Sequence, residues 1–61
     1  MITLTKLNKQ EFILNADLIE TIEETPDTTI KLTNGKLYIV LESADEVVSK
    51  AMTYYRQIYS R

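Results

Sequence analysis

The residues with the clearest capacity for chemistry are acidic and lie close together. Every charged residue from position 17 to position 27 is an acid, namely Asp17, Glu20, Glu23, Glu24 and Asp27. Such a run could hold a cation or dock a basic partner, or it could be the solvated edge of a strand, where charges discourage aggregation. The solvated edge is favoured, because a strand points these acids to both faces and no glycine-turned calcium loop is present.

Catalysis has little support in the residue inventory. Glu20 and Glu24 would share one strand face as paired carboxylates, but acid-base work needs one pKa raised by burial in a pocket, and a short chain encloses little volume. The chain has no Cys and no His, which excludes thiol and imidazole catalysis and zinc-finger spacing. Its single glycine, Gly35, serves a turn. We therefore expect no enzyme, no cofactor and no metal site.

Tyrosines near the C-terminus are a second candidate surface. Tyr55 falls near the centre of an apolar arc and is predicted to belong to the core. Tyr54 and Tyr59 fall at the two edges of that arc, where a ring can be half buried with its hydroxyl in water. Those two positions suit packing and partner contact equally.

The element that carries these tyrosines is predicted to be one amphipathic helix over residues 43–60. Ser43 and Glu46 have the spacing of a capping box, in which each side chain bonds the backbone amide of the other residue. At 100° per residue, the apolar side chains fall on a single arc. They are Ala44, Val47, Val48, Ala51, Met52, Tyr54, Tyr55, Ile58 and Tyr59.

The N-terminal segment is predicted to form a hairpin from the runs 2–7 and 11–15. A three-residue loop, Leu7-Asn8-Lys9, pairs Leu4 with Phe12 and Ile2 with Leu14, whereas a two-residue loop would set Phe12 and Leu14 against threonines. The three-residue loop requires one residue in the left-handed region, and we predict that it is Lys9. Ile13 then points to the outer face.

A third strand is expected over residues 18–24, followed by a turn at Thr25-Pro26-Asp27-Thr28 and a central hairpin over residues 28–41. Asn34-Gly35 is typical of a two-residue type I′ turn, which pairs Leu32 with Leu37 and Ile30 with Ile39 on one face. Tyr38 and Val40 then share the opposite face with Ile13. One helix covers only one face, so we expect this second face to mediate self-association into a homo-oligomer or, as the alternative, to dock another protein.

Together these elements predict an α+β fold: a small antiparallel sheet of about five short strands in two hairpins (residues 1–42), with one long C-terminal helix packed on it (43–60). Nine acids against seven bases give a net charge of -2 and a pI near 4.9, which argues against a nucleic-acid partner. The chain has no long apolar run and no signal-peptide core, so we expect no membrane insertion and a cytoplasmic location.

Nearly the whole chain resembles the FlbD/SwrD-type flagellar and swarming motility proteins, most specifically in LNADLIETIE, TPDTTIKLTNGK and the LES before the helix. The resemblance implies a motility accessory that raises flagellar motor power by protein–protein contact with the stator units, at the inner face of the membrane. The alternative hypothesis is a small β nucleic-acid-binding or regulatory module. The candidate partner surface that we take from the residues comprises Glu20, Glu23, Glu24, Asp27, Tyr38, Val40, Tyr54 and Tyr59.

Overall fold

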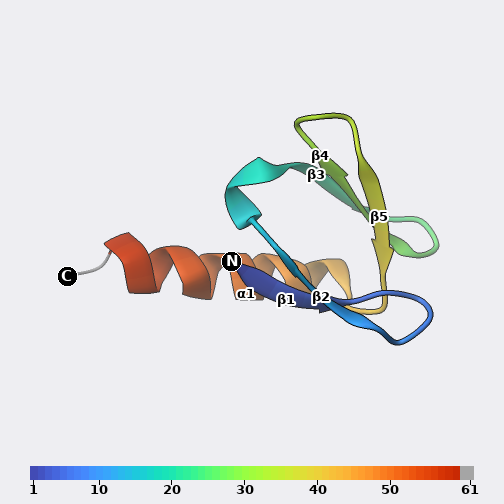
Figure 1. Cartoon of the computed structure of the whole chain (residues 1–61), viewed down its shortest axis with the longest axis horizontal. Coiled ribbons are helices and arrows are strands. Elements are labelled where there is room, and N and C mark those ends of the chain that lie inside the picture. Colours follow the sequence, from blue (N-terminus) through green and yellow to red (C-terminus); the bar gives the residue numbers. More distant parts are fainter. Residues whose placement is uncertain (60–61) are drawn as a thin grey trace.

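A computed structural model describes residues 1–59 and confirms the α+β fold class. The elements in chain order are β1 (Ile2–Thr5), β2 (Glu11–Leu14), the short 3-10 helix η1 (Ala16–Leu18), β3 (Ile19–Glu24), β4 (Thr28–Leu32), β5 (Leu37–Val40) and α1 (Ala44–Tyr59). The strands form two antiparallel sheets, β1-β2 and β3-β4-β5, and α1 contacts β1 and β3 (Figure 1). Ser60, the last residue of the predicted helix, lies outside the described residues.

The first hairpin has the predicted register and loop. Ile2 pairs with Leu14 and Leu4 with Phe12. Lys9 has φ 72°, so it adopts the left-handed conformation that the three-residue loop requires. The loop closes through the Lys6 amide, which donates to the carbonyl of Gln10 at 2.8 Å.

The second hairpin differs from the prediction by one residue. Ile30 pairs with Tyr38 rather than with Ile39. The loop is Thr33-Asn34-Gly35, and the Leu32 amide donates to the Lys36 carbonyl at 2.9 Å to close it. Gly35 takes φ 87° in the third loop position, as Lys9 does in the first hairpin. The two-residue type I′ turn was therefore the wrong choice, because Asn-Gly also suits this longer loop with glycine last.

The one-residue shift exchanges the two faces of β5. Val40, predicted on the uncovered face, is 2% exposed and belongs to the core. Tyr38 is half-buried on the same side. Leu37 and Ile39, predicted beneath the helix, are 63% and 44% exposed. The predicted apolar face of Ile13, Tyr38 and Val40 therefore does not exist.

The five strands are split between the two sheets, and β1 and β5 join them. Val40 forms an isolated antiparallel bridge with Lys6, and the Leu41 amide donates to the Thr5 carbonyl at 2.9 Å. The chain leaves β5 directly afterwards to enter α1, so this pairing extends no further along β1. The inner faces of the two sheets enclose one core, which consists of Ile2, Leu4, Leu14, Ala16, Ile30, Leu32, Val40 and Val47.

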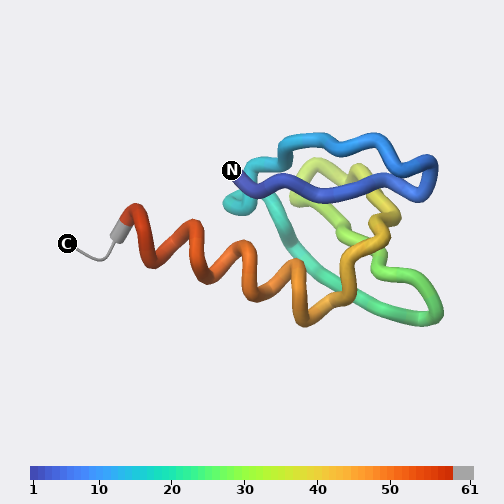
Figure 2. Tube along the Cα trace, turned by 90° about the horizontal axis from the view of Figure 1, so that it is seen from below, coloured from blue at the N-terminus to red at the C-terminus, as the bar shows by residue number. Residues whose placement is uncertain are grey.

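Helix α1 begins at the predicted capping box. The Ser43 hydroxyl accepts from the Glu46 amide, and the Glu46 carboxylate accepts from the Ser43 amide, both at 3.1 Å. Val47, in the first turns, is fully buried in the core. Figure 2 shows that the C-terminal half of the helix extends beyond the strands. The apolar arc is therefore only partly covered, and Val48 and Met52 are exposed.

Candidate interaction surface

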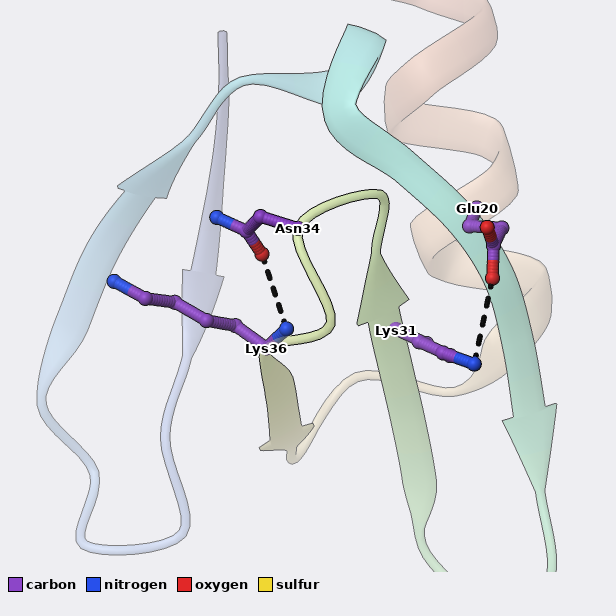
Figure 3. A network of polar contacts seen from close by, with 4 residues as sticks. All are labelled: Glu20, Lys31, Asn34 and Lys36. Carbon is purple, nitrogen blue, oxygen red and sulfur yellow. Dashed lines mark hydrogen bonds and ion pairs between the residues drawn. The ribbon is translucent and has the colours of Figure 1, made fainter.

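The acidic segment does not act as one cluster, because two of its members are engaged with different elements. Glu20 on β3 forms an ion pair with Lys31 on β4 at 3.5 Å, as Figure 3 shows, and both side chains are about half exposed. Glu24, at the end of β3, instead accepts a hydrogen bond from the Ala44 amide at 2.6 Å. Glu20 and Glu24 are therefore not a carboxylate pair.

The Glu24 contact completes the start of α1. A helix begins with unpaired backbone amides and the positive end of its dipole, so a carboxylate is stabilising there. The capping box uses the amides of Ser43 and Glu46, and Glu24 takes that of Ala44. Sequence reasoning missed this role, since the two residues lie twenty positions apart and no local pattern links them.

Asp17, Glu23 and Asp27 are the exposed members of the acidic segment whose carboxylates are unpaired. Within residues 1–59, none of the three carboxylates makes a hydrogen bond or an ion pair. Over the same residues, no three acidic side chains converge in a way that could hold a metal ion. Glu23 lies on β3, the edge strand farthest from β5, and we call Glu20 and Glu23 the β3 acidic edge.

The aromatic candidates lie on separate parts of the molecule. Tyr38 stacks on Phe12 with ring centroids 5.1 Å apart, so it joins the two sheets. Tyr54 is half-buried and meets Tyr55 edge-on at 5.4 Å. The side chain of Tyr59 lies outside the described part of the chain. Together with buried Val40, these positions show that the predicted partner residues do not form one continuous surface.

Glu42 is a carboxylate with a defined role that the sequence did not reveal. It accepts from the Thr5 amide at 2.9 Å and from the Thr5 hydroxyl at 2.7 Å. Partial burial by itself raises the pKa of Glu42, but the hydrogen bonds from Thr5, that from its own amide and the charge of Lys50 outweigh it, so the pKa is lowered. Glu42 thus ties the segment between β5 and α1 to β1.

Lys50 crosses a shallow groove between β1 and α1. The groove has a volume of about 320 Å³, and its helix side is lined by Ser49, Lys50, Thr53, Tyr54 and Gln57. The Lys50 ammonium donates to the Thr3 carbonyl at 2.9 Å, on the edge of β1 that β5 does not reach. The lysine thereby covers a free strand edge, a common way to prevent edge-to-edge pairing.

The outer side of β5 and the residue that follows it carry an exposed aliphatic surface, which follows from the corrected register. Leu37, Ile39 and Leu41 alternate with inward-facing Tyr38 and Val40, and they are 63%, 44% and 52% exposed. We call these three residues the β5 stripe. The run of apolar residues from 37 to 41 indicated this surface in the sequence. The predicted register, however, placed Tyr38 and Val40 on the outer face.

These features define a small α+β domain whose distinctive chemistry lies on exposed strand edges. Residues 1–59 match the family of flagellar and swarming motility proteins, FlbD, and the chain belongs to that family. The suspected relationship is thereby confirmed over all the described residues. Comparisons with curated proteins and with solved structures give no significant match. Among the described residues, no helix is long and apolar enough to cross a membrane.

Proposed function

We propose that this protein is an accessory of the flagellar motor that supports motor power through direct contact with the stator. Membership in a family of flagellar and swarming motility proteins is the observation that carries the proposal. The contacts of the acidic side chains suit a protein that acts by binding a partner rather than by catalysis. Glu24 and Glu42 fasten the start of α1, and Glu20 pairs with Lys31, so none of the three is held for a substrate.

The proposed contact is the β3 acidic edge, and the proposed partner surface is basic. Glu23 is exposed and its charge is unpaired among the described residues, whereas Glu20 is partly neutralised by Lys31. Exposed charges of this kind steer association and select a partner more than they add affinity. The proposed place of action is the inner face of the membrane, next to the stator units.

The proposal is tested by removing the protein from the motile bacterium that encodes it. We expect flagella to be assembled in normal number. The torque of each motor should fall, as measured with a bead attached to a filament of a surface-fixed cell, and swarming should be lost. Expression of the unaltered protein should restore both. Loss of the filaments themselves, or unchanged torque, would contradict a role in motor power.

A charge reversal separates the proposed surface from the fold. Glu23→Lys should leave the thermal midpoint unchanged, because surface substitutions away from structural features usually alter stability by less than about 0.5 kcal/mol. The same variant should fail to restore torque. Gln10→Lys, an exposed substitution just after the first hairpin loop, is the matched control and should restore it. Equal rescue by both variants would show that the β3 acidic edge is not the contact.

A further inference from the structure

One edge of β1 lacks a neighbouring strand over most of its length. The Lys6 amide donates to the Gln10 carbonyl, so the backbone groups of alternate residues from Lys6 back to Ile2 face β2. The backbone groups of Thr3 and Thr5 therefore point to the opposite edge. There β5 supplies only the amide of the residue that follows it, which donates to the Thr5 carbonyl before the chain leaves for α1.

Two charged side chains take the place of the missing strand. The Glu42 carboxylate accepts from the Thr5 amide and the Lys50 ammonium donates to the Thr3 carbonyl, both at 2.9 Å. The Thr3 amide on the same edge has no partner of this kind within residues 1–59. An extended backbone carries both a donor and an acceptor at the spacing of a strand edge, so it can pair with both backbone groups of Thr3.

The groove beside this edge is small and polar. Its volume of about 320 Å³ is at the lower end of the range for ligand pockets, so it suits a short segment of chain rather than a folded domain. Ser49, Thr53 and Gln57 line its helix side with uncharged polar groups, and Lys50 is the only charged side chain among the lining residues.

The charge of Lys50 favours an acidic segment. An ammonium group has three donor hydrogens, and Lys50 uses one of them on the Thr3 carbonyl. Glu42 offsets part of this charge, but both oxygens of its carboxylate already accept hydrogen bonds from Thr5. A carboxylate on an incoming segment can therefore bond the remaining donors of Lys50.

We propose that this groove binds an extended, acidic segment of a partner protein, which adds a strand to β1 at Thr3. The backbone of the segment accepts from the Thr3 amide and donates to the Thr3 carbonyl, and Lys50 moves from that carbonyl to a carboxylate of the segment. A strand without an acid would displace Lys50 and leave it unpaired, so the lysine selects against such strands. The proposal does not depend on the stator contact, because the β3 acidic edge belongs to the other sheet.

The first test follows the isotope-labelled full chain by NMR while the synthetic peptide acetyl-Thr-Val-Glu-Val-Thr-amide is added to millimolar concentration. We expect the amide signals of Thr3 and Lys50 to shift and hydrogen exchange at the Thr3 amide to slow by at least about tenfold at saturation. The same peptide with glutamine in place of glutamate is the control, and it should bind more weakly. Absence of any change at Thr3, or equal binding of the two peptides, would overturn the proposal.

The second test removes one backbone donor at a time. Thr3 and Ile13 are opposite each other in the β1-β2 ladder, and both amides point away from it, so proline at either position keeps the ladder intact. Thr3→Pro should abolish peptide binding, whereas the matched control Ile13→Pro, on the outer edge of β2, should retain it. Circular dichroism should show both variants folded. Equal binding by the two variants would contradict strand addition at Thr3.

The third test separates the role of Lys50 from a purely structural one. Lys50→Gln should still bind through the Thr3 backbone but should no longer distinguish the glutamate peptide from the glutamine peptide. An unchanged preference would overturn the assigned role of the lysine. Hydrogen exchange at Thr3 that slows with rising protein concentration, without any peptide, would overturn the proposal by making a second copy of the chain the occupant.

Discussion

Glu24 at the end of β3 and Ala44 at the start of α1 are joined by a hydrogen bond of 2.6 Å between carboxylate and amide. The contact closes a loop of twenty residues and attaches the helix to the three-stranded sheet. Glu42 makes the equivalent attachment to the two-stranded sheet through Thr5. Two carboxylates thus hold the N-terminus of α1 against both sheets, while the C-terminal half extends beyond the strands (Figure 2).

The first prediction is that Glu24→Ala destabilises the domain and Glu23→Ala does not. Removal of the Glu24 carboxylate leaves the Ala44 amide unpaired and loses a favourable charge at the helix N-terminus, which is typically worth about 0.3–1 kcal/mol at an exposed site. Glu23 is exposed on the same strand without such a contact among the described residues. Chemical denaturation of the two variants measures the difference. Equal free energies of unfolding would contradict the structural role of Glu24.

The second prediction concerns pH and Glu42. Its pKa is lowered in the folded chain from an ordinary value of 4.5, so the ionised carboxylate contributes stability that is fully present above 4.5. That contribution is lost as the pH falls through the lowered pKa of the folded state. Glu42→Gln should therefore be less stable than the unaltered protein at neutral pH, and the gap should close in acid. A gap that is constant from neutral pH to strong acid would show that ionisation of Glu42 does not matter.

The third prediction exchanges lysine and glycine at the left-handed position of each hairpin loop, with opposite effects on stability. Lys9→Gly should stabilise the domain by roughly 1 kcal/mol, because glycine has no steric penalty at φ 72°. Gly35→Lys should destabilise it by a similar amount. An added Cβ at Gly35 would meet nothing within 4 Å, so the cost comes from the backbone conformation alone. Thermal midpoints that move in the same direction for both variants would contradict this account of the loops.

The fourth prediction tests the register of the second hairpin. Val40→Lys should unfold the domain, since an unpaired charge buried in the core costs several kcal/mol, comparable with the whole stability of a small domain. Ile39→Lys should stay folded, because Ile39 is on the outer face. Circular dichroism during heating distinguishes the two. A folded Val40→Lys beside an unfolded Ile39→Lys would restore the register that pairs Ile30 with Ile39.

The first hairpin could be predicted from the sequence because only one of its two registers pairs both Ile2 and Leu4 with large apolar residues. Leu4 meets Phe12 in that register and threonines face outward. In the second hairpin both registers pair residues that favour β-strands with one another, so local packing could not decide between the two registers. The observed register is the one in which Val40 both bridges to Lys6 and enters the core, and that requirement involves a strand more than thirty positions away.

The turn chemistry of the second hairpin was also ambiguous. The type I′ turn requires a positive φ at both Asn34 and Gly35, but in the structure Gly35 alone has one in that loop. The Asn34 side chain instead accepts from the Lys36 amide at 3.0 Å (Figure 3). Asn8 makes the same contact with the Gln10 amide in the first loop. An asparagine in the middle of a three-residue loop is thus a feature of both hairpins.

The candidate site was predicted less well than the fold, because most of its contacts join distant segments. The capping box of Ser43 and Glu46 is local and was confirmed. The roles of Glu24 and Glu42 depend on residues 20 and 37 positions away in the chain and left no local signal. The acidic run was visible in the sequence. Only the structure shows which of its acids attach the helix, which form an ion pair and which are unpaired at the surface.

We propose that the chain acts by direct contact with the stator through the β3 acidic edge. The most direct measurement places a photo-crosslinking amino acid at Glu23 or at Thr53 in motile cells and identifies the products by mass spectrometry. We expect a stator subunit joined to position 23 and none joined to Thr53 on α1. Absence of a stator product at position 23, or an equal yield at Thr53, would contradict the claim.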